Sequence, residues 1–226
     1  MTTTGSAAGV LREALLDALA LVLPVACAGC GAPDRSVCGA CRAALEPAAA
    51  PVERPGIRAW AGLSYAGAAA RAIRSFKDDG RTDAAPALAP ALRAALAAAC
   101  AEPVRPGRLE VAVVPSTAAA RRARGYDPVR LLVRHAGFRS ANVLRALDRA
   151  DQAGLGRAER RANAARSLTA VRPLSGGRFV LVDDVVTTGS TLADAVRAIR
   201  SAGGDVAAIA VLAQTPLRVP EHHLNG

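Results

Sequence analysis

The amino-acid sequence predicts an α/β protein with a doubly wound, mainly parallel sheet and a small cysteine-rich module at its N-terminus. Short apolar runs alternate with segments of helical periodicity from Leu109 to Ala213, as in parallel strands joined by crossover helices. Four cysteines in two C-x-x-C pairs lie between residues 27 and 41, before this alternation begins. The 226 residues suffice for one medium domain with its own core and an additional module.

The composition narrows the range of partners. Hydrophobic residues make up 51% of the chain but aromatic residues only 3%, so the core must be built from Ala, Val and Leu. The formal net charge is +10, and Lys77 is the only lysine among 29 Lys and Arg residues. Guanidinium groups bind phosphates through two parallel hydrogen bonds. Nucleic acid and a polyphosphorylated small molecule are both suited to such a surface.

No segment is expected to span a membrane. The longest apolar run, Ala18 to Gly31, contains Pro24 and is shorter than the roughly 20 residues that a spanning helix needs. Arg12, Glu13 and Asp17 interrupt the apolar pattern, and the basic start of a signal peptide is missing. A lipoprotein, with "LPVAC" (23–27) as its lipid-modification motif, is the alternative. We therefore expect a cytoplasmic protein without a membrane partner.

The first hundred residues are expected to hold the N-terminal module and the first elements of the main domain. Val10 to Leu23 has apolar residues at helical spacing, which predicts a helix within a module over residues 1–45. The segment 46–56 carries three prolines and is interpreted as a linker. The next expected elements are a strand over 57–65 and two Ala-rich helices over 68–77 and 84–100.

The main domain is expected to cover residues 57–217, followed by a tail over 218–226. Asp127 and Pro128 are the residues preferred at a helix N-cap and first position, so a helix is expected to begin there. A polar stretch rich in Gly and Arg runs over 149–166. The other expected elements are strands over 109–116, 141–147, 178–184 and 205–213, and helices over 128–136 and 190–201.

Two adjacent carboxylates end the strand expected over 178–184. Buried acids are costly unless they are paired or face a solvated site, so Asp183 and Asp184 are expected where the strand emerges. The helix that follows offers unpaired N–H groups and a positive dipole, which suit a phosphate. Two carboxylates before it can accept hydrogen bonds from a diol, and a phosphate beside a vicinal diol is ribose 5-phosphate. An ordinary capped helix after a strand is the alternative.

The segment "VLVDDVVTTGSTL" (180–192) resembles the signature loop of type I phosphoribosyltransferases. The cysteine-rich N-terminus, "FKDDGR" (76–81), "VVPS" with "RRARGY" (113–126) and "QAGLGRAERRAN" (152–163) narrow this resemblance to the ComF family of competence-associated and GntX-like proteins. The resemblance implies the type I phosphoribosyltransferase fold. It also implies binding of phosphoribosyl pyrophosphate or a related ribose phosphate, Mg²⁺ at the diphosphate, and transfer of the phosphoribosyl group with release of diphosphate.

The resemblance also implies roles for individual residues. Asp183 and Asp184 are the expected catalytic residues, which would fix the ribose diol and favour the positive charge that develops during transfer. The expected residues for ribose and phosphate are Asp183, Asp184, Val185, Val186, Thr187, Thr188, Gly189, Ser190 and Thr191. Those for diphosphate are Ser116, Thr117, Arg121 and Arg124, and those of a mobile loop are Gln152, Arg160 and Asn163.

The sequence departs from the family in the diphosphate loop. The family has two prolines there and Asn-Gln after its Arg-Gly-aromatic motif, whereas this chain has Pro115 alone and then Asp127-Pro128. A solvated basic face is the alternative for the arginines of residues 121–124. A surface loop with an amphipathic helix is the alternative for 149–166.

The cysteines Cys27, Cys30, Cys38 and Cys41 form two C-x-x-C pairs seven residues apart. Each pair can fold into a knuckle with two thiolates, and two knuckles complete a tetrahedral Zn²⁺ site with a structural role. Disulfides, idle thiols and a redox pair are the alternatives. Cys100 is expected to be an inert buried thiol.

A non-catalytic role is the rival interpretation. The protein would then sense a ligand or act as a scaffold in DNA uptake or recombination, with competence or recombination proteins as partners. The arginine-rich surface predicts weak, nonspecific, salt-dependent binding to DNA. Single-strand binding is disfavoured because aromatic side chains, which stack on bases, are scarce. The sequence does not indicate an acceptor base.

Overall fold

The computed structural model describes residues 25–33, 35–101, 108–147 and 167–216. The predicted helix over 10–23, the polar stretch over 149–166 and the tail over 218–226 lie outside the described residues.

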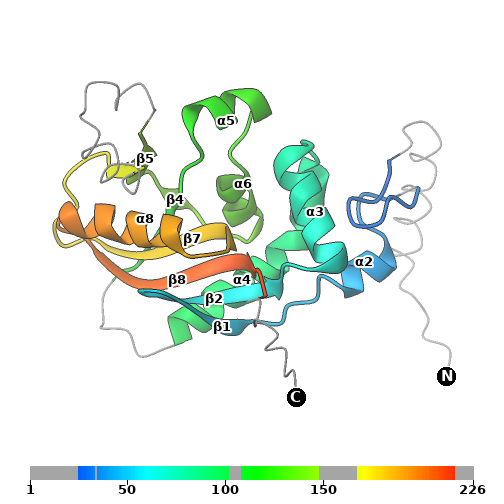
Figure 1. The fold of residues 1–226 in the computed structure, drawn as a ribbon, viewed down its shortest axis with the longest axis horizontal. Helices are drawn as coiled ribbons and strands as arrows, with labels where there is room; N and C mark the ends of the chain where they lie inside the picture. Colours follow the sequence, from blue (N-terminus) through cyan, green and yellow to red (C-terminus); the bar gives the residue numbers. More distant parts are fainter. Residues whose placement is uncertain (1–24, 34, 102–107, 148–166, 217–226) are drawn as a thin grey trace, which may run out of the picture.

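A six-stranded sheet runs through the molecule in the order β1-β2-β8-β7-β3-β4 (Figure 1). Its strands pair in parallel except β1, which is antiparallel to β2. The strands are β1 (Ala50–Arg54), β2 (Ile57–Ser64), β3 (Glu110–Val113), β4 (Ser140–Ala141), β7 (Arg178–Val186) and β8 (Asp205–Gln214). A second sheet pairs β5 (Leu144–Ala146) antiparallel with β6 (Leu168–Ala170). The predicted α/β class with a mostly parallel sheet is confirmed.

Helices cover both faces of this sheet. Two clusters of buried residues, one on each face, alternate along β7: Val180 and Val182 pack in the first, and Phe179 and Leu181 in the second. Because both faces are buried, the strand reads as a continuous apolar run. The helices are α2 (Gly39–Ala43), α3 (Gly67–Asp78), η1 (Thr82–Ala84), α4 (Ala85–Ala101), α5 (Ala118–Arg124), α6 (Pro128–His135) and α8 (Ser190–Ser201).

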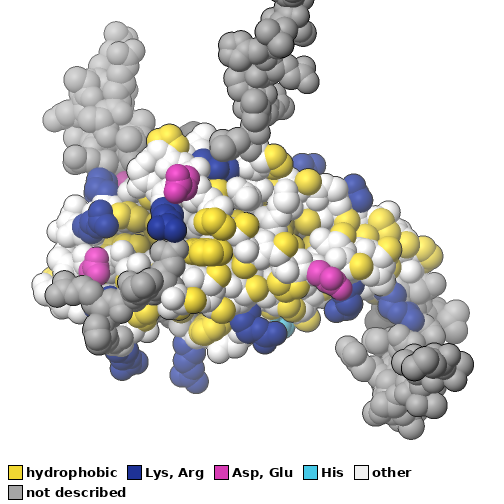
Figure 2. All heavy atoms as spheres, turned by 90° about the horizontal axis from the view of Figure 1, so that it is seen from below, with side chains coloured by type: hydrophobic (Ala, Val, Ile, Leu, Met, Phe, Trp, Pro, Cys, Tyr) yellow, Lys and Arg dark blue, Asp and Glu magenta, His cyan; other side chains and the backbone are white. Residues whose placement is uncertain are grey.

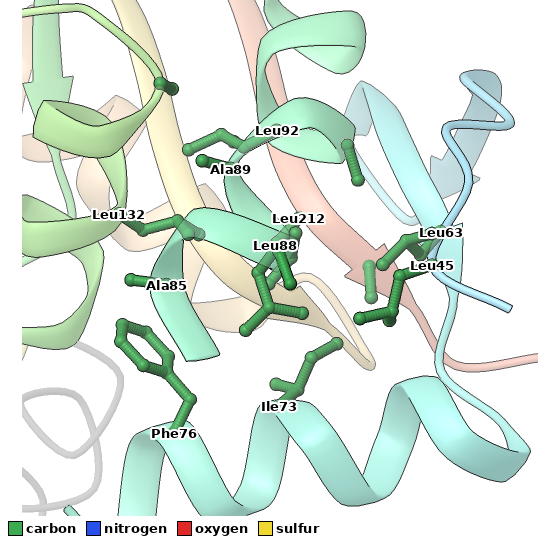
Figure 3. Packing of buried hydrophobic residues seen from close by; sticks show 14 of the residues in the cluster. Leu45, Leu63, Ile73, Phe76, Ala85, Leu88, Ala89, Leu92, Leu132 and Leu212 are labelled. Atoms are coloured by element: carbon green, nitrogen blue, oxygen red, sulfur yellow. The ribbon is translucent and has the colours of Figure 1, made fainter. Parts of the chain in front are cut away.

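The first cluster joins α3, α4 and α6 to the sheet. In Figure 3, Ile73 and Phe76 of α3 point toward Ala85 and Leu88 of α4, and Leu132 of α6 lies beside them. The cysteine-rich segment belongs to the same core, since Cys27, Cys41 and Leu45 are at most 4% exposed and pack in this cluster. The described part of the N-terminal module is therefore packed onto the main domain.

The interpretation of residues 46–56 as a linker is wrong for Ala50–Arg54, which form strand β1. Val52 and Arg54 point inward, and Pro51 is exposed on the edge of the sheet, where a strand tolerates proline. Pro55 and Gly56 connect β1 to β2, with Gly56 at φ 72°. The three prolines suggested a linker, but the Pro-Gly pair is typical of a tight turn.

Two further expectations differ from the structure. The predicted strand over 141–147 is divided, because β4 pairs with β3 whereas β5 pairs with β6 in the second sheet. Helix α5 and strand β6 were not predicted. Helix α5 is short, its apolar residues are all alanines and none of them is buried, so it has no apolar periodicity to detect.

The segment Thr82–Ala101 is long and apolar enough to cross a membrane by length and composition alone. Its helix α4 instead contacts β2, β8 and α6 in the core, and residues such as Leu88, Leu92 and Ala95 are fully buried. Such burial is expected of the central helix of an α/β domain, so the segment is weak evidence for a membrane span.

Candidate functional site

A cavity of about 510 Å³ opens at the carboxyl ends of β3 and β7. From these neighbouring parallel strands the chain continues toward opposite edges of the sheet, since β4 lies on the far side of β3 and β8 on the far side of β7. Ligands of open α/β sheets bind at such switch points. The Val114 N–H donates to the Val182 carbonyl at 2.9 Å, which extends the pairing to the cavity edge. The chain after β3 is thereby held beside the carboxylates that end β7.

Asp183 and Asp184 both line this cavity, but their surroundings differ. Asp184 is 8% exposed, and its Oδ2 lies 2.6 Å from Lys77 Nζ. Asp183 is half-buried and accepts a hydrogen bond from the Asp184 backbone N–H at 2.8 Å. Burial and the neighbouring Asp184 charge raise the pKa of Asp183 well above its usual range. The two carboxylates are therefore not equivalent.

Lys77 was not singled out from the sequence, although it is the only lysine of the chain. It belongs to the last turn of α3, and its side chain is 35% exposed. Burial alone would lower the pKa of Lys77. The negative charge of Asp184 and its hydrogen bond with Lys77 have the larger effect, so the pKa of Lys77 is raised. Its ammonium is a charged group in contact with a predicted catalytic carboxylate. A lone lysine in an arginine-rich chain was the signal available in the sequence.

The loop after β7 leads directly into α8. Thr187 and Thr191 line the cavity, whereas Thr188 and Ser190 are exposed outside the set of lining residues and are within hydrogen-bond distance of each other at 3.1 Å. Val185 also lines the cavity, and Val186 is buried in the core. The structure thus brings part of the predicted phosphate loop to the cavity, and its contact with a phosphate stays a prediction.

Gly189 has a structural role that differs from the expected one. We expected it to let the backbone approach a ligand, but its φ of 83° requires a residue tolerant of the left-handed region. A Cβ placed there would lie 2.9 Å from the Cβ of Arg54. The open side of the glycine therefore faces Arg54 of β1. Arg54 was missed because its strand was interpreted as a linker.

The residues predicted for diphosphate divide into two groups. Ser116, Thr117 and Arg124 line the cavity, whereas Arg121 is exposed and is not among the lining residues. Thr117 caps α5 by accepting from the Ala120 N–H at 3.2 Å. Arg124 lies 3.2 Å from Asp78 of α3, another lining residue. The residues predicted for the mobile loop, Gln152, Arg160 and Asn163, lie outside the described residues.

The four cysteines predicted to bind metal converge at a second site. The sulfur atoms of Cys27, Cys30, Cys38 and Cys41 all lie within 4.8 Å of one another, and all four are free thiols. Tetrahedral zinc–thiolate sites have Zn–S distances of about 2.3 Å, so their sulfurs lie about 3.8 Å apart. The cluster could therefore hold a metal ion such as zinc, and it contains no disulfide.

Backbone groups prepare this cluster for a metal. Burial opposes ionisation of Cys27, but N–H groups of Cys38, Cys30 and Gly29 lower the pKa of its thiol to about 6. The Cys38 and Gly29 N–H groups lie 3.3 and 3.4 Å from its sulfur. Burial and the neighbouring thiols raise the pKa of Cys41 to about 12. Since thiolates are the metal ligands, binding must release protons.

The fifth cysteine differs from its expectation. Cys100 is exposed near the end of α4, so its interpretation as a buried thiol is wrong. It lies on the exposed side of a helix whose Ala and Leu residues supply the buried face.

Comparisons with known proteins agree with the geometry of the cavity. Residues 140–223 match the family described as phosphoribosyl transferase domain, and this range contains both carboxylates and the loop into α8. The chain is also 43% identical over 56 residues to the transcriptional regulator GfcR of Methanocella arvoryzae. That alignment covers 23% of this chain, which spans only 27% of the length of that relative. Part of this mixed α/β fold, residues 140–223, thus matches the phosphoribosyl transferase domain, and a cysteine cluster able to hold a metal lies on its N-terminal side.

Proposed function

We propose that this protein binds phosphoribosyl pyrophosphate in the cavity between β3 and β7 and transfers its phosphoribosyl group. One observation carries the proposal: two carboxylates and the start of α8 line a single cavity, within the range that matches the phosphoribosyl transferase domain. A ribose phosphate needs acceptors for its hydroxyls and N–H donors for its phosphate. Both kinds of group are available on one wall of this cavity.

Each wall of the cavity has a part in this proposal. Asp183 accepts hydrogen bonds from the ribose hydroxyls, since its carboxylate lines the cavity and pairs with no cation among the described residues. The N-terminal turn of α8 receives the 5-phosphate. Ser116, Thr117 and Arg124, which line the same cavity after β3, receive the diphosphate. These contacts hold the reacting carbon between its leaving group and a carboxylate that favours developing positive charge.

Mg²⁺ fits the donor set of this cavity. Carboxylate and hydroxyl oxygens are the ligands that Mg²⁺ prefers, and Asp183, Ser116 and Thr117 supply them. When bound with diphosphate, the ion neutralises the charge of the leaving group.

Calorimetric titration tests the proposal. We expect phosphoribosyl pyrophosphate with Mg²⁺ to bind the wild type and raise its melting temperature. Replacing both Asp183 and Asp184 by Asn removes charged acceptors, whose hydrogen bonds contribute about 1.5–3 kcal/mol each. Asp205→Asn is the control, because Asp205 lies at the far end of β8 with a 57% exposed side chain. Equal affinity of the wild type and the double variant would contradict the diol assignment.

Catalysis needs a separate assay. The protein is incubated with phosphoribosyl pyrophosphate, Mg²⁺ and a panel of bases, and diphosphate is measured. Release of diphosphate with one base identifies an enzyme and its acceptor. Binding without release with any of the bases favours a ligand-sensing protein.

The ligand-sensing alternative is favoured by a named relative and by charge. The similar region of GfcR belongs to a protein named as a transcriptional regulator. A cavity of about 550 Å³ is lined by Arg130, Arg134 and Arg139, and the last two are exposed. On the face in Figure 2, Lys and Arg side chains outnumber acidic ones, in keeping with the net charge of +10. We propose that DNA phosphates bind this surface weakly and without sequence preference.

A salt titration checks the DNA proposal. Affinity for a labelled duplex should fall steeply between low and physiological salt, with a similar slope for unrelated sequences. Replacing Arg134 and Arg139 by Gln should reduce the salt slope by about two. Tight, salt-insensitive or sequence-selective binding would show that charge alone does not explain the interaction.

Two further assignments complete the proposal. We assign Zn²⁺ to the four cysteines, because closed thiolate coordination is typical of structural zinc. Elemental analysis of reduced, freshly purified protein tests it, and absence of zinc would refute it. A cytoplasmic location and a link to competence or recombination proteins stay predictions, and localisation of a tagged full-length chain tests the first.

A further inference from the structure

Arg54 is a buried arginine with an unusual set of partners. It is 8% exposed, and its guanidinium donates to three backbone carbonyls. Nε donates to Thr187 at 2.5 Å, Nη2 to Thr215 at 2.7 Å and Nη1 to Glu53 at 2.8 Å. Within the described ranges no carboxylate pairs with this guanidinium. The side chain therefore joins β1 to the loop after β7 and to the end of β8.

Thr215 adds further contacts at the start of the loop. Its backbone N–H donates to the Val186 carbonyl at 3.1 Å, and its hydroxyl lies 3.4 Å from the same oxygen. The Thr215 carbonyl in turn accepts from Arg54, which also holds the Thr187 carbonyl. The carbonyls of Val186 at the end of β7 and of Thr187 in the loop are thus fixed by Arg54 and Thr215 together.

Because the peptide bond is planar, fixing the Thr187 carbonyl also fixes the direction of the Thr188 N–H. In a trans peptide the carbonyl oxygen of one residue and the N–H of the next point in opposite directions. Because the Thr187 carbonyl points to Arg54, the Thr188 N–H points away from it. The missing Cβ of Gly189 also faces Arg54, so Arg54 lies behind the loop. Arg54 does not line the cavity, whereas Thr187 and Thr191 do.

We propose that Arg54 is the positioning residue of the phosphate loop: it fixes the Thr187–Thr188 peptide so that the Thr188 N–H points to the exposed side of the loop, where the 5-phosphate is taken to bind, and it adds a positive charge behind that N–H. The proposal rests on the proposed function, since the loop is taken to bind the 5-phosphate. Arg54 acts through the loop and does not touch the ligand. A buried charge with only carbonyl partners is costly, and a bound phosphate in front of the loop offsets part of that cost.

Two variants separate geometry from charge. Arg54→Gln keeps an amide donor but removes the charge and at least one of the three hydrogen bonds. Arg54→Lys keeps the charge but loses the planar arrangement of donors. Arg93→Gln and Arg93→Lys are the matched controls, because Arg93 is an exposed arginine of α4 that does not line the cavity. The full-length proteins are titrated calorimetrically with ribose 5-phosphate. Hydrogen exchange of the Thr188 and Gly189 amides is measured without ligand.

We expect Arg54→Gln to weaken ribose 5-phosphate binding by about tenfold or more, because the Thr188 N–H is no longer held in place and the positive charge behind it is lost. Arg54→Lys should recover part of this loss, and the Arg93 variants should bind as the wild type does. The loop amides should exchange faster in Arg54→Gln, while amides in the middle of β8 stay protected. A folded Arg54→Gln protein with affinity within about twofold of the wild type would overturn the proposal.

The exchange measurement keeps this test separate from the proposed function. If the wild type does not bind ribose 5-phosphate, the proposed function fails and exchange alone decides. Faster exchange confined to the loop of Arg54→Gln then supports positioning, and unchanged exchange refutes it. If Arg54→Gln does not fold, Arg54→Lys and Arg93→Lys are compared by ribose 5-phosphate titration and by amide exchange. Weaker binding or faster loop exchange in Arg54→Lys alone supports the proposal, and no difference from Arg93→Lys in either measurement refutes it.

Discussion

Replacing Asp183 by Asn is expected to stabilise the protein while it weakens the proposed ligand site. Asp183 is half-buried beside Asp184, whose carboxylate already binds Lys77. The Asn side chain keeps an oxygen for the hydrogen bond that Asp183 accepts from the Asp184 N–H at 2.8 Å. The substitution therefore removes a charge and preserves the local geometry. A carboxylate that costs stability in the empty protein is typical of a functional position.

The size of the effect follows from the charges. At an effective dielectric constant of about 20, two like unit charges about 4 Å apart repel by about 4 kcal/mol, and the repulsion falls as their separation grows. Lys77 offsets part of this repulsion, so we expect Asp183→Asn to raise the free energy of unfolding by about 0.5–2 kcal/mol. For a chain of this length, 1 kcal/mol shifts the melting temperature by about 2–4 °C.

The pH dependence gives the sharper test. Because the pKa of Asp183 is raised in the folded state, the folded protein retains this proton more firmly than the unfolded chain. The wild type therefore loses stability as pH rises from the ordinary carboxyl pKa, about 3.9, to the raised value. The difference in unfolding free energy between Asp183→Asn and the wild type should be largest above that pH range and should decrease as pH falls through it. Calorimetry of both proteins between pH 5 and 8 measures this, with Asp205→Asn as the exposed control. A variant that melts at or below the wild-type temperature at pH 8 would refute the reasoning.

Three further substitutions probe other contacts. Lys77→Met should lower the unfolding free energy by about 1–3 kcal/mol, since it leaves the buried Asp184 without its cation, and an unchanged melting temperature would contradict this. Cys38→Ser should release zinc and lower the melting temperature of the whole chain, because Cys27 and Cys41 pack in the main core. Elemental analysis measures the zinc content and calorimetry the melting temperature, and an unshifted main transition would contradict this prediction. Asp194→Ala should lower the free energy of unfolding by about 3 kcal/mol, since this 6% exposed carboxylate accepts from two backbone N–H groups and an arginine. A decrease below about 1 kcal/mol in urea unfolding would show that these hydrogen bonds contribute little.

The centre of the fold could be predicted because its signals are local. The apolar run of β7, the adjacent carboxylates and the helix after them all lie within residues 178–201, so one segment determines both element types and the position of the site. The boundaries of β8 and α6 were also close to those expected, since Asp127 caps α6 as predicted by accepting from the Arg130 N–H at 3.1 Å.

The other wall of the cavity could not be predicted in the same way. Lys77 and Asp78 reach it from α3, and Arg54 supports it from β1, more than 100 positions before the loop that it holds. These contacts depend on how the strands are ordered, which hydrophobic periodicity does not encode. The division of residues 141–147 has the same origin, because pairing with β3 or with β6 decides which sheet each residue joins.

Helix α3 links the cysteine cluster, which takes no part in the proposed chemistry, to the cavity of the main domain. Near the start of the helix, the Arg71 Nε donates to the Gly29 carbonyl, which lies between two of the cysteines. At its end, Lys77 reaches Asp184 in the cavity, and the Phe76 carbonyl accepts from the Tyr126 hydroxyl just after α5. A helix fixed at both ends moves as a unit, so its last turn depends on the contacts at its first. We therefore expect the four-cysteine cluster, with a metal ion bound, to help hold one wall of the cavity in place.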